Sequence, residues 1–191
     1  MTSSKMRMPP LAEEAMNDAQ RAAADELIAG PRKGVKGPFI ALLRSPDLMA
    51  RLQKVGEYLR FGSQLPPRLS ELATLIVARE WSQQFEWFTH VPLALKAGVA
   101  QATIDALREG RRPASMAADE ALVFDFATEL TIRKGVSEAT YRQCVDCFAE
   151  QEVVELVSIV GYFTLMSMLL NVAHIPEEAN ANVEPLPALP R

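Results

Sequence analysis

The feature that most restricts the fold of this chain is an uncharged apolar run near its C-terminal end. Residues 156–173, LVSIVGYFTLMSMLLNVA, contain no Asp, Glu, Lys or Arg. A run of this length can form a helix that crosses a bilayer. Carboxylates just before the run and polar residues inside it argue against a membrane span; they are Glu152, Glu155, Ser158, Thr164, Ser167 and Asn171. A helix that is apolar all round also suits the centre of a bundle or an oligomer interface, and this is what we predict.

The rest of the chain has helical periodicity, and no stretch alternates for long with the period of a strand. We therefore predict one all-α domain over residues 1–191, a helical bundle with a helical N-terminal extension over about 1–36. A proline-rich tail over about 176–191 should lie extended along a surface. Serine, proline and glycine signals predict helices at 11–29, 46–61, 101–110, 118–133 and 137–149. Between the second and third of these, one further helix should begin at residue 67 and another should end at residue 98. The apolar helix follows last and ends near residue 174.

Charge and cysteine content narrow the function classes. The net charge of −4 gives no basic footprint for nucleic acid. The two cysteines, Cys144 and Cys147, are too close in sequence to staple a fold, and we interpret them as buried small apolar residues. The N-terminal stretch has cations without an apolar run behind them, so no secretory signal is expected. We predict a cytoplasmic protein that binds neither nucleic acid nor membrane.

The stretch FEWFTH, residues 85–90, combines aromatic side chains with a carboxylate and one of the two histidines. On a helix, Gln83, Glu86 and His90 share one face, so the carboxylate and the imidazole can touch. The carboxylate favours the charged imidazole, whereas burial among aromatics opposes it, which predicts proton exchange near neutral pH. Pro92 cannot donate to the carbonyl of Phe88, so the helix should kink or loosen there. The alternative is a solvated helix pair beside ordinary core aromatics.

The region from Arg68 to Gly110 resembles the carboxymuconolactone decarboxylase family, relatives of the alkylhydroperoxidase D (AhpD) proteins. The resemblance rests on a glutamate followed by E-W-x-x-H and a glycine-terminated helix, matched here by Glu71, Glu86, Trp87, His90, Ala94, Ala97 and Gly98. It implies an AhpD-like helical bundle and a homo-oligomer, either a dimer, a trimer or a hexamer. The peroxidase branch of this superfamily has C-x-x-C where this chain has Gln83 and Glu86, so the thiol chemistry of that branch lacks its sulfur here.

The resemblance then implies a lyase that decarboxylates a small organic acid or lactone without a cofactor. His90 would transfer the proton, Glu86 would set the pKa of its imidazole, and Glu71 would hold the opposite ring nitrogen or a water. Gln83 could bind a lactone or carboxylate oxygen. Arg60, Arg68 and Arg79 could bind a carboxylate, although solvated helix arginines are the alternative. The aromatic side chains expected to exclude water are Trp81, Phe85, Trp87 and Phe88.

Two further function classes stay open. One is a thiol-dependent peroxidase of the alkylhydroperoxidase (peroxiredoxin) type, in which Cys144 and Cys147 would supply the sulfur. The other is a non-catalytic binder of an apolar ligand. We predict no metal site, because two histidines far apart and a single Glu-x-x-x-His do not supply three ligands. The expected partners are a small-molecule substrate and further copies of this chain.

Overall fold

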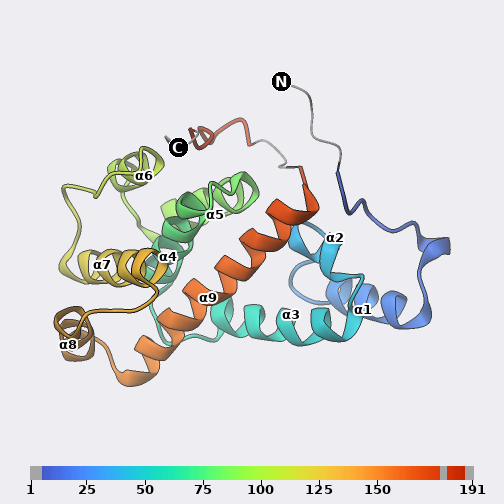
Figure 1. The fold of residues 1–191 in the computed structure, drawn as a ribbon, viewed down its shortest axis with the longest axis horizontal. Coiled ribbons are helices and arrows are strands. Elements are labelled where there is room, and N and C mark those ends of the chain that lie inside the picture. Colours follow the sequence, from blue (N-terminus) through green and yellow to red (C-terminus); the bar gives the residue numbers. More distant parts are fainter. Residues whose placement is uncertain (1–5, 177–179, 188–191) are drawn as a thin grey trace.

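The computed structural model describes residues 6–176 and 180–187, and the regular elements in these ranges are all helices. The predicted all-α class is therefore confirmed. Figure 1 shows α9 crossing the molecule obliquely, with α1 to α3 on one side and α5 to α8 on the other. The helices are η1 (Glu13–Ala15), α1 (Asp18–Ala29), α2 (Pro38–Leu42), α3 (Pro46–Phe61), α4 (Pro67–Glu80), α5 (Gln84–Ala97), α6 (Gln101–Arg108), α7 (Ala118–Arg133), α8 (Glu138–Cys147) and α9 (Glu150–Ala173).

Several helix boundaries agree with the local sequence signals, and others differ from them. The predicted helix over 11–29 is interrupted, because Asn17 accepts a hydrogen bond from the Gln20 amide and starts α1 there with a capping box. Ser45 stands at the N-cap of α3 but makes no side-chain capping hydrogen bond. No helix was predicted at α2, which follows Gly37 and begins at Pro38.

Two helices form the centre of the bundle. α4 is buried along most of its length and packs against α5, α7 and α9. α9 buries one face against α2, α3, α4 and α7 through residues that include Leu156, Ile159, Phe163, Met166 and Leu170. The opposite face of α9 is exposed in a single copy of the chain, so the predicted all-round burial holds for only part of its surface.

By length and composition α9 could cross a membrane, and it is the one helix of the described residues that meets this test. In its most apolar window, 56% of the residues are buried inside the protein. A core helix of this kind meets the same test. Its packing against four other helices is consistent with the predicted role at the centre of the bundle.

The buried carboxylate of Glu155 ties α9 to the connection between α3 and α4. It accepts hydrogen bonds from the Tyr58 hydroxyl (2.5 Å), the Ser63 hydroxyl (2.7 Å) and the amide of Gln64 (2.8 Å). Burial raises the pKa of this carboxyl, but the hydrogen bonds outweigh burial and lower the pKa to about 2. The glutamate that argued against a membrane span is thus a structural anchor in the bundle.

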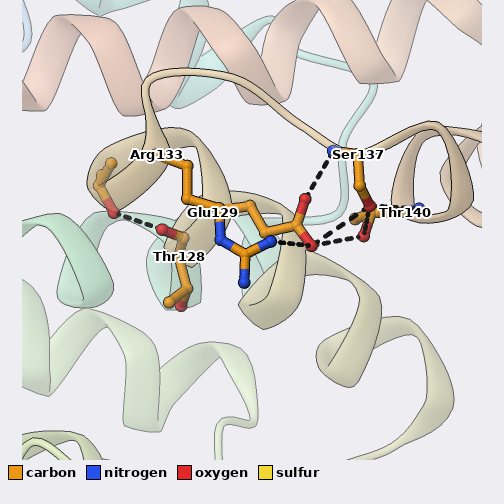
Figure 2. A network of polar contacts seen from close by, with 6 residues as sticks. Thr128, Glu129, Arg133, Ser137 and Thr140 are labelled. Carbon is orange, nitrogen blue, oxygen red and sulfur yellow. Dashed lines mark hydrogen bonds and ion pairs between the residues drawn. The ribbon is translucent and has the colours of Figure 1, made fainter.

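The corner between α7 and α8 is held by Glu129 (Figure 2). Its carboxylate accepts from the Ser137 amide (2.6 Å) and the Thr140 hydroxyl (2.9 Å), and Arg133 lies 4.0 Å away. The hydrogen bond from the Ser137 amide is the main reason why the pKa of Glu129 is lowered. Because Ser137 is also the N-cap of α8, the carboxylate fixes where that helix begins.

Residues 180–187 lie against α4, α5 and α6. They begin with a turn in which the Val183 amide donates to the Asn180 carbonyl, so only the part after this turn fits the extended course predicted for the tail. The Trp87 indole donates to the Glu184 carbonyl (3.0 Å), and Gln84 exchanges two hydrogen bonds with Leu186 (2.7 and 3.0 Å). Arg79 and Arg108 donate to the carbonyls of Pro187 and Pro185. Residues 188–191 lie outside the described part of the chain, as do 177–179 and 1–5.

Candidate active site

His90 lies on α5 between two carboxylates that come from different helices. Its Nδ1 donates to Oε2 of Glu71 on α4 at 2.6 Å, and its Nε2 is 3.4 Å from Oε2 of Glu86 one turn earlier on α5. The His90 and Glu86 side chains are 3% and 4% exposed, and that of Glu71 is 16% exposed. The structure therefore brings the three predicted catalytic residues together, and their role in catalysis stays a prediction.

The two carboxylates decide the charge of the imidazole. Burial lowers the pKa of His90, but the hydrogen bonds and charges of Glu71 and Glu86 outweigh burial and raise the pKa to about 9. The sequence suggested proton exchange near neutral pH. The structure instead favours an imidazolium at neutral pH, because it supplies a second carboxylate at the opposite ring nitrogen.

Local sequence signals position α5 and hence His90. Gln83 caps the helix by accepting from the Phe85 amide (2.9 Å), and Gly98 ends it in the left-handed region with φ of 102°. Pro92 lies inside α5, which continues through it as one helix of 14 residues. The carbonyl of Phe88 therefore lacks its main-chain partner one turn later without ending the helix.

A cavity of about 670 Å³ opens beside His90 and Glu86. The edge of the Phe163 ring meets the His90 ring with centroids 4.9 Å apart, and Tyr162 packs against Phe163 in the same way at 5.4 Å. A second wall is built by residues 31–39, the connection from α1 into α2. Glu71 does not line the cavity, so it supports the imidazole from behind.

Of the residues predicted to bind substrate or exclude water, Arg60, Phe85 and Phe88 line the cavity, whereas Gln83, Arg79, Trp81 and Trp87 do not. The Phe85 ring covers Gly37, where an added Cβ would lie 2.3 Å from the ring and where φ is 55°. Arg60 lies in the last turn of α3. Glycine at position 37 is thus required by both the backbone and the close approach of Phe85.

The structure corrects the predicted place of the other four, which do not line this cavity. Gln83 is the cap of α5, and its amide donates to Asn171 Oδ1 at 2.8 Å, so it does not share the face of His90. Trp87 is fully buried and holds the C-terminal segment, as Arg79 does. Trp81 packs against the core and its carbonyl accepts from Asn171. The helical spacing was extended one residue beyond the true start of α5.

Three other predicted candidates also lie away from the cavity. Arg68 pairs with Asp119 (2.6 Å) and Glu120 (2.6 Å) of α7. Cys144 on α8 is buried as predicted, but Cys147 on the same helix is exposed, so its predicted burial is wrong. Neither cysteine lines the cavity. Burial raises the pKa of Cys144 to about 11, which disfavours the thiolate.

Sequence reasoning missed Arg32, Tyr162 and Phe163 as cavity residues. Tyr162 and Phe163 belong to the apolar run, where their pattern indicated only core. Arg32 stands in a glycine- and lysine-containing connection without a helical register, so no local signal directed it to His90. Among the described residues, no group of three or more His, Cys, Asp or Glu side chains is arranged to hold a metal ion.

The helical fold is that of AhpD core structures. Residues 46–129, from the start of α3 to the last turns of α7, match the carboxymuconolactone decarboxylase family. The predicted resemblance to the carboxymuconolactone decarboxylase family and its AhpD-like relatives is therefore confirmed over residues 46–129. No curated protein matches the chain.

Solved structures share the fold at low sequence identity. An AhpD core from Ralstonia eutropha JMP134, described as an uncharacterized peroxidase-related protein, is 16% identical with a TM-score of 0.74, covering 92% of this chain and 93% of that one. An uncharacterized peroxidase-related protein from Silicibacter sp. TM1040 is 14% identical, with a TM-score of 0.71 and 94% of each chain covered. A protein of unknown function from Agrobacterium tumefaciens, named as a candidate antioxidant defence protein AhpD, is 14% identical, with a TM-score of 0.65, covering 73% of this chain and 96% of that one.

Proposed function

We propose that the protein is a cofactor-independent lyase that breaks a carbon–carbon bond in a small organic acid or lactone, with His90 as the proton donor. The observation that carries this proposal is the buried imidazole held between Glu71 and Glu86 at the wall of a cavity. The raised pKa of His90 keeps the imidazole protonated at neutral pH, which is the form that a general acid needs.

The proposed reaction consumes one proton and needs no other reactant besides the substrate. The bond between the substrate carbon and its carboxylate breaks, carbon dioxide leaves, and the electron pair passes into a conjugated carbonyl of the substrate. His90 then delivers its Nε2 proton to the carbon, while Nδ1 stays hydrogen-bonded to Glu71. A proton from water restores the imidazolium. Positioned proton transfer of this kind contributes typically about 10²–10⁴-fold to a rate.

The walls of the cavity support this chemistry. Phe39, Phe85, Phe88 and Phe163 line it beside His90, so an apolar substrate body can displace water. Exclusion of water strengthens the electrostatic effect of the imidazolium on the developing negative charge. Glu86 stands next to the proton that is transferred, and its charge keeps that proton on Nε2 until substrate is present.

A thiol peroxidase is the alternative suggested by the names of the structural neighbours. It would need a thiolate activated near the histidine. In this chain Glu86 occupies the position of the second cysteine of C-x-x-C, and the two cysteines are on α8 outside the cavity lining. This arrangement favours the lyase over the peroxidase.

The experiment is an assay of the purified protein on a panel of unsaturated lactone acids, including carboxymuconolactone, that measures carbon dioxide release. We expect His90→Gln to lose nearly all turnover while circular dichroism shows an intact fold. The double variant Cys144→Ser, Cys147→Ser is the control and should keep wild-type turnover. Turnover that survives in His90→Gln contradicts the proposal, and loss in the cysteine variant together with peroxide reduction by the wild type assigns the peroxidase instead. Binding of panel members without turnover would indicate the non-catalytic binder.

We also propose that the protein forms a homo-oligomer through α9. Apolar residues and one glycine repeat every three or four positions along its exposed face, at Val154, Val157, Gly161, Leu165, Met168 and Val172. We call this set the α9 stripe. A continuous apolar stripe of this kind is costly to leave in water and is typical of an interface.

A further inference from the structure

We propose that Arg32 and Tyr162 form a carboxylate-binding subsite in the cavity beside His90, and that the ligand is a small carboxylate with a planar apolar body. This inference deepens the proposed function, since it places the substrate relative to His90. Ligand binding by this subsite does not itself depend on any reaction, so it can be tested without turnover.

The first observation is a pair of buried polar atoms without partners. Nη2 of Arg32 and the hydroxyl oxygen of Tyr162 are both buried, and among the described residues neither atom has a hydrogen-bond partner of good geometry. Burial raises the pKa of Tyr162, and the guanidinium of Arg32 beside it opposes this rise. Both residues line the cavity. Buried polar groups are almost always hydrogen-bonded, so two adjacent exceptions at a cavity wall indicate that a ligand or solvent atom satisfies them. A carboxylate oxygen can accept from a guanidinium and a phenol together.

The charge of Arg32 supports an anionic ligand. Burial and the nearby charge of Arg60 lower the pKa of Arg32, whereas Tyr162, Glu86 and Glu57 oppose this shift. Its guanidinium lies over the Phe39 ring, 4.5 Å from the centroid. The same cavity is lined by Lys36 and Arg60, whereas the carboxylate of Glu86 is paired with His90. The cavity therefore carries cations that no wall carboxylate neutralises by contact.

The second observation is the space that Gly56 leaves for the two groups. A Cβ at this position of α3 would lie 2.1 Å from the Tyr162 hydroxyl and 2.7 Å from Nη2 of Arg32. The helix thus lacks a side chain at the one point where the phenol and the guanidinium meet. Only glycine permits this approach, because any Cβ would push the hydroxyl or the guanidinium aside.

The path from the subsite to His90 is apolar. Tyr162 packs edge-on against Phe163, and Phe163 packs edge-on against His90. A planar ligand lying on Phe163 would present one end to Arg32 and Tyr162 and the other to the imidazolium. Arg32 precedes and Tyr162 follows residues 46–129, the stretch that matches the carboxymuconolactone decarboxylase family. The specificity we infer is therefore a property of this chain rather than of the shared family core.

Benzoate is the probe, with benzamide as its uncharged isostere and phenylphosphate as the competing anion. Ligand-observed NMR titrations with the full chain give the affinity of each compound. We expect the wild type to prefer benzoate over benzamide, and Arg32→Gln and Tyr162→Phe each to weaken benzoate about tenfold or more while leaving benzamide unchanged. Tyr162→Phe keeps the ring and removes only the hydroxyl, so it does not disturb the packing of Phe163.

Two matched controls separate the subsite from general effects. Arg51→Gln removes a cation from α3 outside the cavity and should leave benzoate binding unchanged. Gly56→Ala should weaken benzoate, whereas Gly135→Ala, where an added Cβ meets nothing within 4 Å, should not. The inference is overturned if the wild type does not distinguish benzoate from benzamide, or if Arg32→Gln and Tyr162→Phe keep the preference. Tighter binding of phenylphosphate than of benzoate would overturn the carboxylate assignment. Because turnover is not measured, an inactive lyase assay leaves this result intact.

Discussion

Glu71 and His90 stand 19 residues apart on consecutive helices, and their side chains meet at 2.6 Å. The contact depends on the packing of α4 against α5 and holds the imidazole by Nδ1, so that Nε2 is directed to Glu86 at the cavity.

The first prediction concerns the pH dependence of stability and activity. The folded pKa of His90 is raised to about 9 from 6.5, so its stabilising contribution is complete below pH 6.5 and is lost as the pH rises through about 9. We expect urea denaturation to show this loss in the wild type and not in His90→Gln, and kcat to fall on the alkaline side with the same pKa. A histidine that titrates by NMR at its ordinary pKa would contradict this.

The second prediction compares the two carboxylates. The hydrogen bond that His90 donates to Glu71 raises the pKa of His90 more than its contact with Glu86 does. Glu71→Gln should therefore lower the His90 pKa, measured by NMR titration, further than Glu86→Gln does. Glu86→Gln should reduce kcat more than substrate affinity, because Glu86 sets the proton at the reacting nitrogen. Equal pKa values in the two variants would show that the shorter contact is not the dominant one.

The third prediction concerns the buried carboxylate of Glu155. Glu155→Gln places an amide group among donors and removes a charged acceptor of several hydrogen bonds. We expect the free energy of unfolding to fall by about 2–3 kcal/mol. The wild-type contribution is present above pH 4.5 and is lost as the pH falls towards 2, the folded pKa. Glu150→Gln at the exposed start of α9 is the control and should change the unfolding free energy by less than about 0.5 kcal/mol.

The fourth prediction tests the α9 stripe. Val157 and Leu165 are 43% and 36% exposed in one copy of the chain, and a buried charge in their place would be costly in an interface. Val157→Asp and Leu165→Asp should each shift the protein towards monomer in multi-angle light scattering. Ile132→Asp on α7, at an apolar residue that is 61% exposed, should not. A stable wild-type monomer at micromolar concentration rules out the proposed assembly.

The fifth prediction concerns the C-terminal segment, residues 180–187. Gln84→Ala removes both hydrogen bonds to Leu186, so the Leu186 amide should exchange faster with deuterium while global stability falls by about 1 kcal/mol. Gln101→Ala, whose side chain bonds only within α6, serves as the matched control. Because Asn180 and Ala181 line the cavity, the same variant should weaken ligand binding if the segment shapes the cavity mouth. Unchanged exchange at Leu186 would show that the segment is held by its other contacts.

Local sequence determined most of the helices and the pairing of Glu86 with His90. Proline at 46 and 67 and glycine at 98 mark helix ends because each acts on the backbone of its own residue and neighbours. The contact of Glu86 with His90 follows from four-residue helical spacing alone. The same spacing failed for Gln83, since it assumed that α5 begins one residue earlier than it does.

The protonation state of His90 and the identity of the residues that line the cavity depend on the tertiary structure. The position of Glu71 at Nδ1 depends on how α4 packs against α5, and this second carboxylate turns a poised imidazole into a cation. Arg32 and Tyr162 meet across Gly56, which requires α1, α3 and α9 to be placed together. Trp87 was predicted to exclude water and Arg79 to bind a substrate carboxylate, but both side chains are directed to the C-terminal segment instead. Contacts between residues far apart in the chain depend on packing, and helical periodicity carries information only about neighbours on the same helix.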